Sequence, residues 1–171
     1  KINTDSQVQV DYSESVRKIR LLRGEAHFAV AHNKAWPFEV YAGKGRVKAV
    51  GTAFSVQLSD DVVQVLVSEG RVDLAAVVHN ATSIESGAKG SIEDSVNAGK
   101  EKVEAVYTPE LATIGSLDMG QQARFYNRAL TTSDNKIAAD RASGLIEQID
   151  TLADEELERR LAWRSGYLVF S

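Results

Sequence analysis

Three glutamates carry the carboxylates that acid–base chemistry would need. Glu25, Glu39 and Glu69 each stand among alternating apolar residues, and glycoside hydrolysis uses two carboxylates about 5–10 Å apart. The same alternation places each glutamate most simply on the solvent-facing side of a strand or at a turn. No aromatic cluster surrounds them, since Trp36 and Trp163 are the only tryptophans. We therefore expect no catalytic residue and no enzymatic activity.

Metal, thiol and phosphate chemistry also lack the spacing that they require. His27 and His32 are five residues apart, which puts them on opposite faces of a strand, and His79 is remote from both. The chain has no cysteine, so thiolate ligands, thiol catalysis and disulfides are excluded. No group of glycines precedes a helix with the spacing of a phosphate-binding loop. We expect no metal site and no cofactor.

Length and charge place the chain among globular domains. Its 171 residues are 43% hydrophobic, enough for one domain with a core of its own. A net charge of −4 with intermixed signs argues against nucleic-acid binding. No apolar run approaches the ~20 residues that span a bilayer, so we expect no membrane insertion by this stretch. Because the chain begins at Lys1 and ends at Ser171 inside a strand-like run, we expect it to be part of a longer protein.

Apolar residues change parity at several glycines. Val47 and Ala49 are odd-numbered, whereas Phe54 and Val56, beyond Gly51, are even-numbered. Strand side chains alternate between faces, so a bend at the glycine would let both sets face one core. The same change occurs at Gly24, Gly70 and Gly166. An ordinary hairpin turn at each glycine is the alternative, and both interpretations predict an all-β core.

The pattern predicts an all-β fold, a jelly-roll-like or solenoid-like double sheet with glycine-bent strands and one short C-terminal helix. The helix is expected within residues 151–164, where Thr151 and Asp154 have capping-box spacing and Leu157 and Leu161 share a face. Residues 81–116 are rich in Ser, Gly, Glu and Lys and are predicted to be a loop or insertion. Residues 117–125 are expected to return to the sheet.

Short motifs follow one another along the chain, among them residues 20–30, 37–40, 50–56 and 67–72. Together they resemble the FecR family of transmembrane regulators of iron-responsive sigma factors in Gram-negative bacteria. The resemblance covers residues 2–76, 117–125 and 157–170, and leaves out 81–116. The motif residues are Gly24, Glu25, Phe28, Pro37, Phe38, Gly51, Thr52, Phe54, Glu69, Gly70, Trp163 and Gly166.

The resemblance implies the periplasmic domain of a single-pass inner-membrane protein. In that family a cytoplasmic segment controls a sigma factor, and the periplasmic part recognises the signalling domain of an outer-membrane TonB-dependent transporter, which regulates iron-uptake genes. Members usually continue into a small C-terminal subdomain that contributes to receptor binding. We expect residues 1–171 to be one FecR-like domain that lacks the cytoplasmic segment, the membrane helix and this subdomain, so that only the absent cytoplasmic segment would meet the sigma factor.

The motif residues have different expected roles. Phe28, Phe54 and Trp163 are most simply core, whereas Glu25 and Glu69, beside turning glycines, could bond loop amides or meet a partner. A partner strand could also add to a final edge strand formed by Tyr167, Leu168, Val169 and Phe170. A carbohydrate-binding or glycan-processing β-sandwich of the cell envelope is the alternative function.

Overall fold

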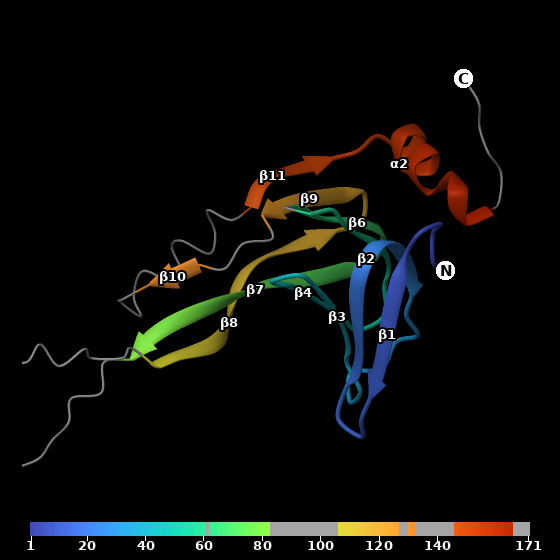
Figure 1. Cartoon of the computed structure of the whole chain (residues 1–171). Helices are drawn as coiled ribbons and strands as arrows, with labels where there is room; N and C mark the ends of the chain where they lie inside the picture. The colour runs from blue at the N-terminus through green and yellow to red at the C-terminus, as the bar shows by residue number, and fades with distance from the viewer. Residues whose placement is uncertain (61, 83–105, 127–129, 133–145, 166–171) are drawn as a thin grey trace, which may run out of the picture.

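The computed structural model describes residues 1–60, 62–82, 106–126, 130–132 and 146–165. The strands are β1 Gln7–Tyr12, β2 Arg17–Ala29, β3 Phe38–Ala42, β4 Gly45–Ala49, β5 Ala53–Leu58, β6 Val62–Glu69, β7 Arg71–Thr82, β8 Val106–Asp118, β9 Gln121–Tyr126, β10 Leu130–Thr132 and β11 Ile146–Thr151, and the helices are α2 Asp154–Leu161 and η1 Ala162–Ser165, a 3-10 helix. The predicted all-β fold with one short C-terminal helix is confirmed (Figure 1).

The strands form one curled sheet whose two halves share β2. The first half contains β1, β2 up to Leu21, β3, β4, β7, β8 and β10, and the second contains β2 from Gly24, β5, β6, β9 and β11. Neighbouring strands are antiparallel except for the β2–β3 and β10–β7 pairs. The predicted double sheet thus takes the form of one sheet that curls around a common core (Figure 1).

Glycines mark the points where the chain passes from one half of the sheet to the other. Gly24 lies inside β2 with a φ of 79°, Gly51 separates β4 from β5, and Gly70, with a φ of 76°, separates β6 from β7. A positive φ in this range is costly for residues other than glycine. Neither β4 and β5 nor β6 and β7 pair with each other. The bent-strand interpretation is confirmed at these three positions and the hairpin alternative is wrong there; Gly166 lies outside the described residues.

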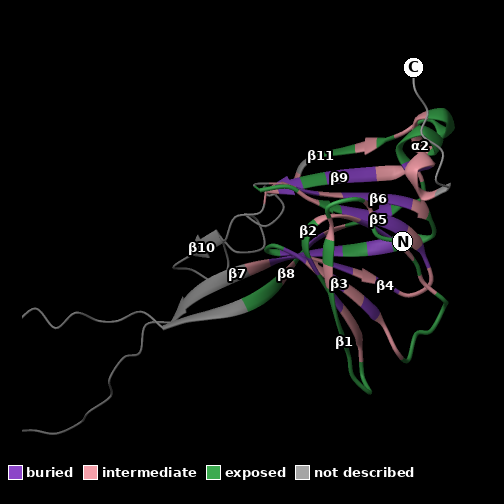
Figure 2. Cartoon of the chain, turned by 45° about the vertical axis from the view of Figure 1, so that its right-hand side comes forward, coloured by how far each residue is buried: buried purple, intermediate pink, exposed green. Residues whose placement is uncertain are grey.

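The core joins the two halves through aromatic rings. Phe38 of the first half lies 5.5 Å from Phe28 and 6.4 Å from Phe54 of the second, between ring centroids, and Phe28 lies 5.3 Å from Phe54. Val47 on β4 and Val56 on β5 are both fully buried. The odd and even apolar sets on either side of Gly51 therefore do face one core, which Figure 2 shows as buried segments in both halves.

Gly45 is a second contact between the halves, and we expect Gly45→Ala to destabilise the fold. A Cβ atom at this position would overlap the ring of Phe125, lying 2.5 Å from its Cζ atom. Overpacking of this kind costs about 1–3 kcal/mol of unfolding free energy, measurable by urea denaturation. Phe125→Leu should recover part of the loss in the double mutant because it removes the clashing ring atoms. An additive double mutant would contradict this packing.

The region between β7 and β8 corrects one expectation. Strand β8 pairs with β7 from Asp118, opposite Arg71, to Val106, opposite Thr82. Residues 81–82 and 106–116 are therefore strand and not the loop that was predicted, whereas residues 83–105 lie outside the described part. Two features of the sequence concealed this strand: its polar composition and Pro109. Proline occurs in sheets almost only on edge strands, and β8 is such a strand, since β7 is its only partner among the described strands.

The C-terminal helix is found within the predicted range, but it begins differently. Ala153 is the N-cap and no side chain caps the helix, so the predicted capping box of Thr151 and Asp154 is wrong. Acidic residues in the first turn and basic residues in the last suit the helix dipole instead. Strand β11, just before the helix, was not predicted. Within the described residues, none of the helices has the length and apolar character to cross a membrane.

Candidate partner-binding surface

Helix α2 and η1 cover the outer face of the second half of the sheet. On β6, Val63, Val65 and Val67 point into the core, whereas Leu66 points outward and is only 5% exposed. Leu161 of α2 is 2% exposed, and neither leucine belongs to the main core cluster. Apolar surface on both elements is thus buried outside the main core, in the region where the helix meets the sheet.

A buried histidine joins this face to η1. His27 on β2 is 7% exposed; its Nδ1 lies 3.1 Å from Ser55 Oγ and its Nε2 lies 3.2 Å from Arg164 Nη1. Arginine can only donate, so Nε2 accepts and Nδ1 carries the proton that is donated to Ser55. Burial, followed by the positive charges of Arg164 and Lys1, lowers the pKa of His27 from 6.5 to about 4. The geometry therefore holds a neutral imidazole.

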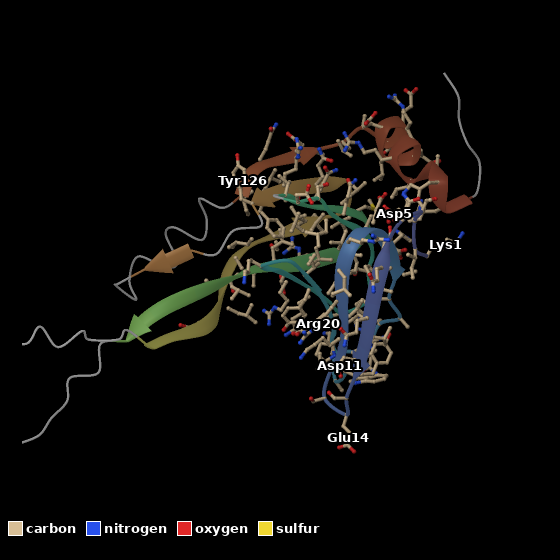
Figure 3. The ribbon with its side chains drawn as sticks, viewed as in Figure 1. Lys1, Asp5, Asp11, Glu14, Arg20 and Tyr126 are labelled. Atoms are coloured by element: carbon tan, nitrogen blue, oxygen red, sulfur yellow. The ribbon has the colours of Figure 1, made fainter. Side chains whose placement is uncertain are left out.

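The N-terminal residue Lys1 also contacts His27 and η1. Lys1 donates from its backbone amine to the carbonyl of His27 at 2.8 Å, and His27 N donates to the Lys1 carbonyl at 2.8 Å. The Lys1 ammonium donates to the carbonyl of Arg164. Figure 3 shows Lys1 and Asp5 near η1, at the opposite end of the β1–β2 pair from Asp11 and Glu14. Residues more than 130 positions apart are thus connected around His27.

Three hollows lie beside α2 or beside the bend of the chain at Gly51. One of 140 Å³ is lined by Glu25, Ser55, Gln57, Gln64, Leu66 and Arg160. A second of 210 Å³ is lined by Ala53, Ser68, Glu69, Leu157, Glu158, Leu161 and Arg164. A third of 340 Å³, which shares Ala53 and Glu69 with the second, extends to Ala29, Val30, Ala31, His32, Gly51 and Thr52. The two glutamates singled out in the sequence therefore line hollows beside the same helix.

Glu25 and Glu69 differ in their bonding. Glu25 Oε2 accepts from Asn3 Nδ2 at 2.8 Å, and the Glu25 backbone N–H donates to Ser6 Oγ at 2.8 Å, so this residue fastens the N-terminal segment to β2. Glu69 is exposed at the end of β6, and its carboxylate makes no hydrogen bond or ion pair with side chains or backbone in the described part of the chain. Of the two roles left open, bonding within the domain describes Glu25, and contact with a partner remains available to Glu69.

The other motif residues lie in the framework. The backbone carbonyl of Pro37 accepts from Arg17 N at 2.9 Å where β3 begins. Thr52 is 6% exposed at the Gly51 corner. The buried atoms Thr52 Oγ1 and Trp163 Nε1 have no hydrogen-bond partner within the described residues. Gly166 and the proposed partner edge, Tyr167 to Phe170, lie outside the described residues.

The third glutamate is also held within the domain. Glu39 accepts from Tyr41 Oη at 2.9 Å and lies 3.4 Å from Arg46 Nη1. No group of three or more His, Cys, Asp or Glu side chains able to hold a metal ion occurs in the described ranges. Glu39 is thus bonded to two residues of its own half of the sheet, Tyr41 on β3 and Arg46 on β4.

Sequence reasoning missed the contacts made by His27 and Leu66. His27 was interpreted as an isolated surface residue because its partner Arg164 lies 137 positions away. Leu66 did carry a signal, since a leucine between Val65 and Val67 is apolar at a position that alternation assigns to the outer face. Such a residue indicates that another element covers that face.

Comparison with known proteins gives a family match for part of the chain and solved structures of similar fold. Residues 1–73 match the family model described as FecR protein. Two crystal structures of a proposed anti-sigma factor from Parabacteroides distasonis ATCC 8503 share the fold, with TM-scores of 0.56 and 0.51 at 17% and 18% identity. They align with 99% and 94% of this chain, which spans only 57% and 52% of theirs. No curated protein matches. Residues 1–73, which include the bends at Gly24, Gly51 and Gly70, thus match the FecR family model, and the resemblance is confirmed over these residues.

Proposed function

We propose that this chain is the periplasmic sensing and relay domain of an inner-membrane sigma-factor regulator. It recognises the signalling domain of an outer-membrane TonB-dependent transporter and so controls transcription of iron-uptake genes. The FecR match over residues 1–73 carries the proposal, because this segment supplies β1 to β6, the beginning of β7 and the corners between the sheet halves. The role is binding and relay without catalysis, and the sigma factor is contacted by a cytoplasmic segment.

The arrangement of α2 suits a relay. Most of the second half of the sheet belongs to the matched segment, and the helix rests on its outer face through a small apolar contact and a few polar bonds, among them the donation from Arg160 Nη1 to Gln122 Oε1 at 3.1 Å. A partner that touches this face could therefore move α2 without disturbing the main core.

We also propose that residues 1–171 form one domain and that the segment between β7 and β8 is an insertion in it.

Glu69 provides the test of where the partner binds. The purified chain is titrated calorimetrically with the signalling domain of a TonB-dependent transporter from the same organism. Glu69→Gln should weaken binding about tenfold, which corresponds to ~1.4 kcal/mol, because it removes an unpaired carboxylate beside the hollows. The matched control is Glu14→Gln, an exposed carboxylate at the far end of the β1–β2 pair (Figure 3), which should leave affinity unchanged.

The outcomes of this titration distinguish an incorrect partner from an incorrect binding surface. If the unmodified chain binds none of the organism's transporter signalling domains, the proposed partner is wrong for this chain. If it binds one and Glu69→Gln binds equally well, the partner is right and the surface lies elsewhere. Transcription from a sigma-dependent reporter in cells should follow the calorimetric order of the variants.

The envelope glycan alternative gains no support from the described tryptophans. The Trp36 ring packs edge-on to Tyr12 at 5.8 Å, Arg17 lies 5.2 Å from its centroid, and its Nε1 donates to the Ser13 carbonyl. Trp163 is half-buried in η1. Neither ring lines the three hollows beside α2, so the described residues present no aromatic groove there.

A further inference from the structure

Strand β1 is an unprotected edge of the sheet. Among the described strands it pairs only with β2, so the backbone groups on its other side have no partner strand (Figure 1). Two other edge strands are irregular. Strand β8 contains Pro109, and its pairing with β7 shifts register between Leu74 and Ala75. The pairing of β11 with β9 shifts register between Ile146 and Gln148. Proline and bulges prevent an edge from pairing with another chain. From Val8 to Tyr12, β1 has neither.

Apolar side chains accompany this free edge. Val10 lies opposite Ile19 and Val8 opposite Leu21, so the valines share the core-facing side of the sheet. Ile19 is 7% exposed, yet Val10 is 58% exposed and Tyr12 50% exposed. The difference arises because no described strand lies beyond β1 to cover them. A further strand alongside β1 would bury both side chains and satisfy the unpaired backbone groups.

We propose that β1 pairs antiparallel with β1 of a second copy of this chain, with the two Val10 residues opposite each other. A two-fold axis perpendicular to the sheet keeps each residue on its own face. This register places Val8 against Tyr12 on the core-facing side, and β-branched and aromatic residues form favourable cross-strand pairs. On the other side it places Gln9 against Asp11, an amide donor facing a carboxylate acceptor.

Neighbouring registers are less favourable. Centring the axis on Asp11 would put two carboxylates directly opposite each other, which destabilises a strand pair. Centring it on Gln9 would put Tyr12 against Ser6 and leave the ring largely uncovered. The Val10 register therefore combines apolar cover with the absence of opposed like charges. It depends on β1 alone and not on the function proposed above.

The pairing is expected to be weak. Six residues on each side bury less than the roughly 1,000 Å² of a stable interface, so the dissociation constant should be about 0.1–1 mM. In sedimentation equilibrium the mean mass should rise with concentration from 18.6 kDa toward twice that value. Val10→Lys, which opposes two ammonium groups, should remain monomeric. Ile149→Lys, at the 46% exposed position on β11, is the matched control and should still associate.

Single cysteines test the register, because the chain has none of its own. Residues opposite each other in antiparallel strands have Cα atoms about 4.5–5.5 Å apart, which a disulfide can bridge. Under a mild oxidant, Val10→Cys should form covalent dimers at least tenfold faster than Gln9→Cys or Met119→Cys. Circular dichroism confirms that each variant is folded.

Three results would overturn the proposal. The first is a chain that stays monomeric at millimolar concentration and forms no Val10→Cys dimer. The second is cross-linking that is fastest at Gln9→Cys, which would show a different register. The third is equal loss of association in Val10→Lys and Ile149→Lys, which would place the contact on another surface.

Discussion

Phe54→Ala is expected to lower the free energy of unfolding by about 3–5 kcal/mol. The Phe54 side chain is fully buried and lies within 5.3 Å of the Phe28 ring and 6.4 Å of the Phe38 ring, between centroids. These rings come from both halves of the sheet, so truncation would open a cavity where the halves meet. A loss of this size is a large share of the ~5–15 kcal/mol that stabilises a typical domain.

Urea denaturation measures the change directly. The matched control is Met119→Ala, since the Met119 side chain is 64% exposed and should contribute less than about 0.5 kcal/mol. If Phe54→Ala loses transporter binding in calorimetry, the unfolding data decide whether the cause is a direct contact or a disordered domain. A loss below about 1 kcal/mol would contradict the role of Phe54 in joining the halves.

The bends between the halves were predictable because they depend on local information. Side chains of a strand alternate with period 2, so a parity change shows where the core-facing set is exchanged. At Gly24 and Gly70 the backbone also has a positive φ, which glycine accepts more readily than other residues. The pattern around Gly51 therefore contained both the corner and the two sets of inward residues.

Elements whose local signals conflict with their pairing could not be predicted. Strand β8 contains Pro109 and Gly115, two residues that strands disfavour, and its identity depends on the long register with β7. The contact between His27 and Arg164 spans 137 positions, and only the folded arrangement of α2 and η1 brings these residues together. The sequence singled out Glu25 and Glu69, which line hollows beside α2, but it did not indicate the elements that complete these hollows.

The hydrogen bond between Arg164 and His27 depends on pH, whereas the apolar contacts of the core do not. The imidazole is positioned to accept a hydrogen bond from Arg164, and protonation would replace that bond by two facing positive charges. Ser55 can accept from Nδ1 in either protonation state, so the cost falls on the side that faces η1. Acid should therefore weaken the attachment of α2 and η1 before it affects the apolar core.

Acidification is expected to destabilise the domain through His27. The pKa of this residue is about 4 in the folded chain and 6.5 when unperturbed, so the unfolded chain takes up the proton first as the pH falls. The stabilisation by neutral His27 is complete above about pH 6.5 and is lost progressively down to about pH 4, with a total of at most about 3 kcal/mol. Urea denaturation at about pH 7.5 and about pH 4.5 should show the loss.

Variants isolate this contribution from that of the carboxylates. His27→Gln keeps an oxygen that can accept from Arg164 but cannot titrate in this range, so its stability should fall less on acidification than that of the unmodified chain. His32→Gln, at an exposed position, should behave like the unmodified chain. Equal pH dependence in all three would show that His27 is not held neutral. An NMR titration of the His27 ring then reports the pKa itself, and Arg164→Met should raise it because one of the charges that lowers it is gone.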